Sequence, residues 1–117
     1  MPLDPCPLTL DPASLTTDEL KRFGLTMLQP KDGYRFTLDP LLLCDFTGAG
    51  KEQRIADLGT GTGVMALILA SMAVQSKVVA FEQDAEAAAL AQRNVGLNAL
   101  SERVTVLHED VLHVSRY

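Results

Sequence analysis

The sequence has few residues that could build a disulfide framework, a metal centre or a membrane span. Its two cysteines, Cys6 and Cys44, lie far apart and form no C-x-x-C pair, which argues against a disulfide scaffold or a zinc site. The longest apolar stretch covers residues 64–74, well short of the roughly 20 residues that a membrane span needs. The N-terminal segment lacks the basic region and apolar run of a signal peptide. These absences predict a soluble, cytoplasmic protein with free thiols and no membrane contact.

Basic residues are also scarce relative to acidic ones. The 117-residue chain has 10 Lys and Arg against 15 Asp and Glu, a formal net charge of −5. Nucleic-acid-binding domains normally present a basic face, so these residues do not supply the attraction for a nucleic acid, although they could bind a small cationic ligand. Hydrophobic residues make up 47% of the sequence and charged residues 21%, which is typical of a folded globular domain and not of a disordered chain.

All prolines fall before residue 41, and this part of the chain differs from the rest. Residues 1–13 are expected to form an extended arm. Thr16 to Glu19 reads as a T-x-x-E capping box, which predicts a short helix that Gly24 ends.

A hairpin and a second helix are expected next. An Asp-Gly pair at residues 32–33 lies between two β-prone runs, 25–29 and 34–37, and this pattern predicts a β-hairpin. Asp39 and Pro40 suit the N-cap and first position of a helix, which Gly48 or Gly50 would end.

From residue 54 the pattern alternates between strand and helix. Strands are predicted over 54–58, 77–82 and 103–107, with helices over 64–72 and 84–100. Three parallel strands joined by two helices are half of a doubly wound, Rossmann-like α/β fold. We therefore expect three parts: the arm over 1–13, a helix, hairpin and helix over 14–50, and the α/β half-domain over 51–117.

A glycine-rich loop, D-L-G-T-G-T-G over residues 57–63, follows the first of these strands. In such a sheet a ligand binds at the carboxyl ends of the strands. The dinucleotide fingerprint G-x-G-x-x-G, counted from Gly59, needs glycine or alanine where Val64 stands. The loop therefore disfavours an NAD-type oxidoreductase.

Electrostatics favours S-adenosylmethionine (SAM) as the ligand of this loop. A pyrophosphate beside Asp57 would meet a like charge at short range. SAM has no phosphate, and Asp57 would attract its sulfonium and α-ammonium directly or through water. Backbone N–H groups at the start of the following helix could receive its carboxylate.

Two further acids stand at the ends of the next strands. Glu82 lies about 20 residues after Gly63 and can accept both ribose hydroxyls, and Asp110 can accept the exocyclic amine of adenine. One such acid alone would more often be a solvated strand end or a turn residue. Together with Asp57 they favour a nucleoside site. Asn94 and Asn98 are better suited to structural contacts than to catalysis.

With these residues in place, the chain resembles class I SAM-dependent methyltransferases. The run from Gln29 to Leu43 is similar to the signature of bacterial adenine-N6 methyltransferases that act beside the anticodon of valine tRNA, a group of small-domain methyltransferases. The resemblance covers residues 16–112. It implies cofactor contacts from Phe36, Thr37, Asp39, Asp57, Gly59, Thr60, Gly61, Gly63, Glu82, Gln83, Asp110 and Val111. Gln83 departs from the aliphatic residue that is common there.

The resemblance does not extend to a catalytic motif. This family catalyses with an Asn-Pro-Pro-Tyr type motif after a fourth strand, and neither Asn94 nor Asn98 is followed by proline. We therefore expect the SAM-binding part of an adenine-N6 tRNA methyltransferase, truncated before its catalytic residues and before its tRNA contacts. The alternative is a non-catalytic SAM-binding module that acts with a partner chain. In either case the strand over 54–58 would be an exposed edge that favours self-association.

Overall fold

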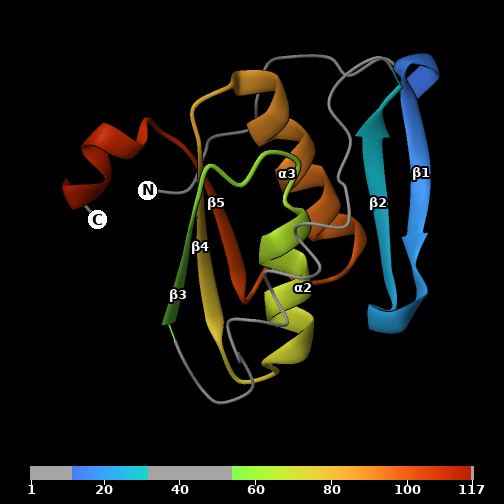
Figure 1. Cartoon of the computed structure of the whole chain (residues 1–117), viewed down its shortest axis with the longest axis horizontal. Coiled ribbons are helices and arrows are strands. Elements are labelled where there is room, and N and C mark those ends of the chain that lie inside the picture. Colours follow the sequence, from blue (N-terminus) through green and yellow to red (C-terminus); the bar gives the residue numbers. More distant parts are fainter. Residues whose placement is uncertain (1–11, 32–53, 117) are drawn as a thin grey trace.

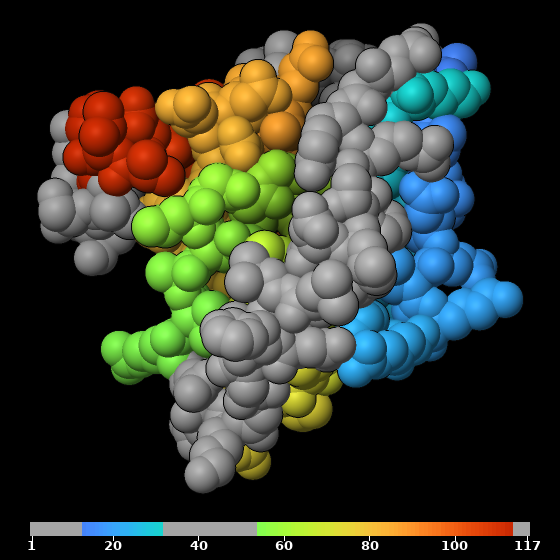
Figure 2. Space-filling view, viewed as in Figure 1, coloured from blue at the N-terminus to red at the C-terminus, as the bar shows by residue number. Residues whose placement is uncertain are grey.

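The computed structural model describes residues 12–31 and 54–116. The strands are β1 (Leu15–Leu20), β2 (Leu25–Pro30), β3 (Arg54–Leu58), β4 (Lys77–Glu82) and β5 (Val104–His108), and the helices are α2 (Val64–Met72) and α3 (Ala85–Leu97). Three 3-10 turns, η1 (Pro12–Ser14), η2 (Lys21–Phe23) and η3 (Val111–Arg116), complete the described elements. Figure 1 shows the layers: the sheet β3-β4-β5, the two helices on one face, and the β1-β2 hairpin beyond them. The hairpin and η3 lie on opposite sides of the molecule (Figure 2).

The predicted α/β fold with three parallel strands is confirmed. β3 pairs with β4 and β4 with β5, both in parallel, so that Ile55 lies opposite Val78 and Val78 opposite Val104. The second helix is shorter than expected at its C-terminal end, because Ala99 adopts a positive φ of 55° that a helix does not allow. Its start agrees, with Asp84 as the N-cap residue whose side chain accepts the Ala87 N–H at 2.9 Å.

The helix predicted after Thr16 is wrong, because residues 15–20 form strand β1. This strand pairs with β2 in antiparallel register, from Leu15 opposite Pro30 to Leu20 opposite Leu25. Instead of capping a helix, the Thr16 hydroxyl donates to the backbone carbonyl of Gln29 at 3.4 Å. A β-branched residue is well suited to a strand, and pairing with β2 outweighs the four-residue capping pattern.

The hairpin is therefore displaced along the chain. β2 is a strand as expected, but the partner that the structure gives it is β1, and the connection is η2 with Gly24 in the left-handed region at φ 67°. The predicted partner strand over 34–37, the Asp-Gly turn and the helix expected over 39–50 lie outside the described residues, as does nearly all of the arm over 1–13.

The core lies on both sides of the helix layer. α2 is apolar all round, and six of its nine residues are buried, because the sheet covers one side and the hairpin another. Leu20, Leu25 and Met27 of the hairpin join Val78, Ala80, Val104 and Val106 of the sheet in one buried cluster around the helices. Within the described parts of the chain, neither helix has the length and apolarity to span a bilayer.

Candidate functional site

The three predicted acids lie at one edge of the sheet. Asp57 is the second-last residue of β3, Glu82 is the last residue of β4, and Asp110 follows β5 by two positions. Because the strands are parallel, their carboxyl ends meet at this edge, which Figure 1 shows at the top of the sheet together with the loop into α2. The structure thus brings together the loop and the acids that the sequence singled out.

The glycine loop turns sharply over the end of β4. The N–H groups of Gly59 and Thr60 both donate to the Phe81 carbonyl, at 2.8 and 2.9 Å. Gly61 has a φ of 60°, and no described residue lies within 4 Å of the Cβ that a side chain there would add. Gly63 is different, since a Cβ there would meet the Cβ of Ala91 at 3.4 Å. The third glycine therefore allows α2 to approach α3, whereas Gly61 has no such neighbour among the described residues.

Asp57 is directed at the loop that follows it. Its side chain is 8% exposed, and its Oδ2 accepts the Thr60 hydroxyl at 2.7 Å. Burial raises the pKa of this carboxyl, the hydrogen bonds from Thr60 and from the Ala66 backbone oppose that rise, and the nearby charge of Glu82 adds to it. Asp57 thus joins the end of β3 to the loop and to the first turn of α2.

Glu82 joins the loop to the start of α3. Its Oε1 accepts the Gly61 N–H at 2.8 Å, and its Oε2 accepts the Asp84 N–H at 2.9 Å. The residue is partly exposed. Because each carboxylate oxygen has two lone pairs, both oxygens keep the capacity to accept a further hydrogen bond from a ligand hydroxyl.

Asp110 lies in the turn between β5 and η3. Its Oδ1 accepts the Leu112 N–H at 2.9 Å, and its own N–H donates to Glu109 at 3.2 Å. The neighbouring Val111 and Gln83 are exposed at the same edge of the sheet. These residues form the β5 side of the site.

The two histidines near this edge take part in local contacts. His108 Nε2 lies 3.0 Å from the Gln83 carbonyl, and His113 Nδ1 lies 3.2 Å from Glu109. In residues 12–31 and 54–116 no three His, Cys, Asp or Glu side chains are grouped as metal ligands.

Gln29 is a residue near the loop that the sequence analysis did not identify as part of the site. Its side chain is fully buried, its Oε1 accepts the Thr62 hydroxyl at 3.3 Å, and its Nε2 has no hydrogen-bond partner among the residues that the structure describes. β2 alternates between buried and half-buried residues, with Leu25, Met27 and Gln29 on the buried side. A polar residue in the apolar register of a strand is the signal that could have identified it.

Asn94 and Asn98 make structural contacts, as the sequence analysis expected. The buried Asn94 side chain bonds the backbone of Leu28 in both directions and donates to the Thr62 carbonyl at 2.9 Å. Asn98 bonds the backbone of Thr26 in both directions, at 2.8 Å each. α3 thereby holds both the hairpin and the glycine loop.

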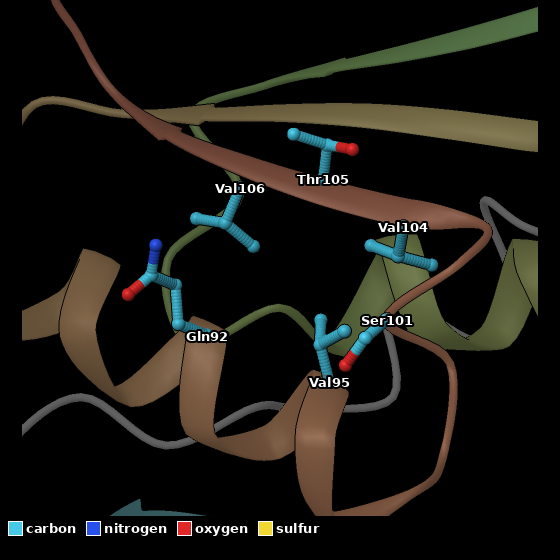
Figure 3. A pocket seen from close by; sticks show the side chains of 6 residues that line it. All are labelled: Gln92, Val95, Ser101, Val104, Thr105 and Val106. Atoms are coloured by element: carbon cyan, nitrogen blue, oxygen red, sulfur yellow. The ribbon is translucent and has the colours of Figure 1, made fainter. Parts of the chain in front are cut away.

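Three of the expected cofactor contacts, Phe36, Thr37 and Asp39, lie outside the described residues. The structure has a separate cavity between α3 and β5, shown in Figure 3, where Val95, Val104 and Val106 face one another. No residue of the loop or of the acidic strand ends lines this cavity, so it is not part of the candidate site.

Comparison with known proteins identifies the family. The model of the methyltransferase small domain matches residues 39–116, two thirds of the chain. The chain belongs to this family. The small-domain region includes the glycine loop, all three acids and both asparagines.

Relatives and solved structures agree with this assignment. The tRNA1(Val) (adenine(37)-N6)-methyltransferase of Citrobacter koseri is 36% identical over 104 residues, which cover 84% of this chain and 42% of that protein. A SAM-dependent O-methyltransferase structure from Thermotoga maritima is 34% identical over 67% of this chain and 30% of that one, with a TM-score of 0.58. The structure of P. horikoshii TYW2 in complex with MeSAdo shares the fold, with a TM-score of 0.72 and 19% identity over 83% of this chain and 36% of that one. The chain thus spans about two fifths of the length of the curated relatives that it matches.

Proposed function

We propose that the glycine loop and the three strand-end acids bind SAM, and that the chain is the cofactor-binding part of an adenine-N6 tRNA methyltransferase. The observation that carries the proposal is the arrangement at the sheet edge, where Asp57, Glu82 and Asp110 lie at the strand ends beside a loop in which no described residue would contact a Cβ added at Gly61. The similarity to tRNA1(Val) (adenine(37)-N6)-methyltransferases supports the choice of reaction and of tRNA as the methyl acceptor.

The residues present fit such a cofactor. Glu82 and Asp110 are partly exposed acceptors, which suit the ribose hydroxyls and the adenine amine respectively. Gly59 and Gly61 have the positive φ that the turn of the loop needs, and no described residue lies within 4 Å of a Cβ added at either position. Gly63, Thr60 and Asp57 hold the loop in place, while Gln83 and Val111 would flank the adenine. From the resemblance, Phe36, Thr37 and Asp39 are proposed to lie at the methionine end.

Bound SAM would supply an electrophilic methyl group on its sulfonium. The work of this chain is to bind and orient the cofactor, because positioning lowers the barrier of a methyl transfer by reducing its entropic cost. The negative charge at the sheet edge favours the positively charged end of the cofactor over a phosphate ligand. No residue of this chain is assigned a catalytic role.

Isothermal titration calorimetry with SAM, S-adenosylhomocysteine and NAD tests the cofactor. We expect saturable one-site binding of the first two ligands and none of NAD. Glu86→Gln, an exposed change on the first turn of α3, is a matched control for Glu82→Gln, which should weaken binding. Tight NAD binding with no response to SAM would overturn the proposal.

The alternative, a SAM-binding module that works with a partner chain, predicts the same binding. In a methylation assay on unmodified valine tRNA, activity of the 117-residue chain alone would exclude both proposals, because each leaves the catalytic residues outside this chain. Self-association is also proposed, since β3 pairs on one side only within the described residues and Leu58 at its end is 55% exposed. Analytical ultracentrifugation would measure it. A cytoplasmic location follows from the proposed tRNA substrate.

A further inference from the structure

The buried amide of Gln29 lies beside the glycine loop, and its nitrogen is unpaired among the described residues. The side chain is fully buried, and its contact with the loop is the 3.3 Å bond from the Thr62 hydroxyl to Oε1. Within residues 12–31 and 54–116, its Nε2 has no hydrogen-bond partner. Turning the amide over would let Nε2 donate to the Thr62 hydroxyl, but Oε1 would then lack a partner. A buried polar group without a partner destabilises the folded state, so such a group needs an explanation.

The neighbours of this amide point to an anionic ligand group. Thr62 directly precedes Gly63, the N-cap residue of α2, and the N-terminus of a nine-residue helix carries partial positive charge. Glu82 contacts the loop from the end of β4, through the Gly61 N–H, whereas the Thr62 side chain contacts the hairpin. A ligand carboxylate would be repelled by Glu82, and a neutral amide donor on the hairpin side reduces that repulsion.

We propose that Gln29 is a binding residue for the carboxylate of the amino-acid part of SAM, with Nε2 as the donor beside the N-terminus of α2. This inference rests on the proposed function. It divides the cofactor between two parts of the chain: the strand ends of β4 and β5 would bind the nucleoside, and the end of β2 would bind the amino-acid part. In a water-shielded position, an amide donor forms a stronger hydrogen bond to a carboxylate than it would at the surface.

A purely structural Gln29 would hold Thr62 and make no contact with a ligand. The two roles differ in one measurable respect. A structural residue affects every ligand of the loop to a similar extent, whereas a carboxylate-binding residue affects only those ligands that have a carboxylate. S-adenosylhomocysteine contains the amino-acid part, and 5′-methylthioadenosine contains the same nucleoside without it.

The experiment measures the binding of both ligands to the full chain by calorimetry. Gln29→Glu keeps the size of the side chain and an acceptor for Thr62 but replaces the donor with a carboxylate. We expect its Kd for S-adenosylhomocysteine to rise at least tenfold and its Kd for 5′-methylthioadenosine to change less than twofold. Gln29→Met removes the acceptor for Thr62 as well as the donor, so it should weaken both ligands by the factor seen in Thr62→Val and should weaken S-adenosylhomocysteine further. Thermal melts followed by circular dichroism will show which variants fold. Thr62→Val, which removes the loop contact and leaves Nε2, should shift both ligands by the same factor.

Two results overturn the inference and can be told apart. If the folded Gln29 variants weaken both ligands equally, or weaken neither, Gln29 has no role in binding the carboxylate and the proposed SAM site stands. If the unaltered chain binds neither ligand, the proposed function fails and the role of Gln29 fails with it.

Discussion

Asn94 pairs with the backbone of Leu28 as a residue of a neighbouring strand would. Its Oδ1 accepts the Leu28 N–H at 2.7 Å, and its Nδ2 donates to the Leu28 carbonyl at 3.1 Å. Asn98 repeats this arrangement on Thr26. Four residues of a helix rise about 6 Å and two residues of a strand about 6.6 Å, so the two side chains match alternate residues of β2. The two asparagine side chains of α3 therefore hydrogen-bond backbone groups on the edge of β2 that does not pair with β1.

Replacing Asn94 should destabilise the protein more than an average substitution. Asn94→Ala removes three hydrogen bonds and leaves the backbone of Leu28 and the carbonyl of Thr62 without these partners. We expect the free energy of unfolding to fall by about 2–4 kcal/mol in urea titrations. The control is Arg93→Ala, an exposed neighbour on the same helix, which should change it by less than about 0.5 kcal/mol. Equal effects of the two substitutions would contradict the role of the asparagine.

Comparing alanine substitutions of Gly61 and Gly24 separates the effect of backbone strain from the effect on ligand binding. Both have positive φ, 60° and 67°, and no described residue lies within 4 Å of an added Cβ at either position. Alanine at either site should lower the free energy of unfolding by about 1–2 kcal/mol, because the left-handed region is unfavourable for an L-residue. Only Gly61→Ala should also weaken SAM binding, by tenfold or more in calorimetry. A similar loss of affinity in Gly24→Ala would show that the effect comes from lowered stability and not from the loop.

The raised pKa of Asp57 makes stability depend on pH in a defined direction. Burial favours the neutral carboxyl, so the folded state holds this proton more tightly than the unfolded state. The contribution of Asp57 to stability is therefore fully present below its ordinary pKa of 3.8 and decreases as the pH rises to the folded-state pKa, above which it is constant. Urea titrations across this pH range measure the free energy of unfolding. The decrease due to Asp57 should appear in the unaltered chain and be absent from Asp57→Asn.

Thr60→Val tests the cause of that pKa. The Thr60 hydroxyl donates to Asp57 at 2.7 Å and lowers the pKa of the carboxyl, against the effect of burial. Removing it should move the pH-dependent decrease in stability to higher pH. A shift to lower pH would contradict the conclusion that the Thr60 hydrogen bond lowers the pKa of Asp57.

Glu82→Gln should affect binding more than stability. The amide keeps one acceptor for the N–H groups of Gly61 and Asp84 and loses the other, so we expect a loss of about 0.5–1.5 kcal/mol. Its affinity for SAM should fall at least tenfold, because an amide cannot accept both ribose hydroxyls. The control is again Glu86→Gln. The proposed nucleoside site would be wrong if the affinity of Glu82→Gln for SAM fell no further than that of Glu86→Gln.

The sequence by itself determined the part of the fold that depends on local signals. Apolar periodicity and the glycine loop predicted β3, α2, β4, α3 and β5 to within a few residues, and the parallel arrangement followed from that order. The position of the acids followed too, because parallel strands end at one edge of their sheet.

Only the tertiary structure decided the role of the N-terminal segment and of its contacts. The T-x-x-E pattern at Thr16 favoured a helix, but pairing with β2 along six residue pairs made it a strand. The partners of Asn94 lie 66 residues away in β2, and Gln29 reaches Thr62 across 33 residues. Such contacts are absent from any local pattern, since the packing of the hairpin against α3 is what buries these amides and selects their partners.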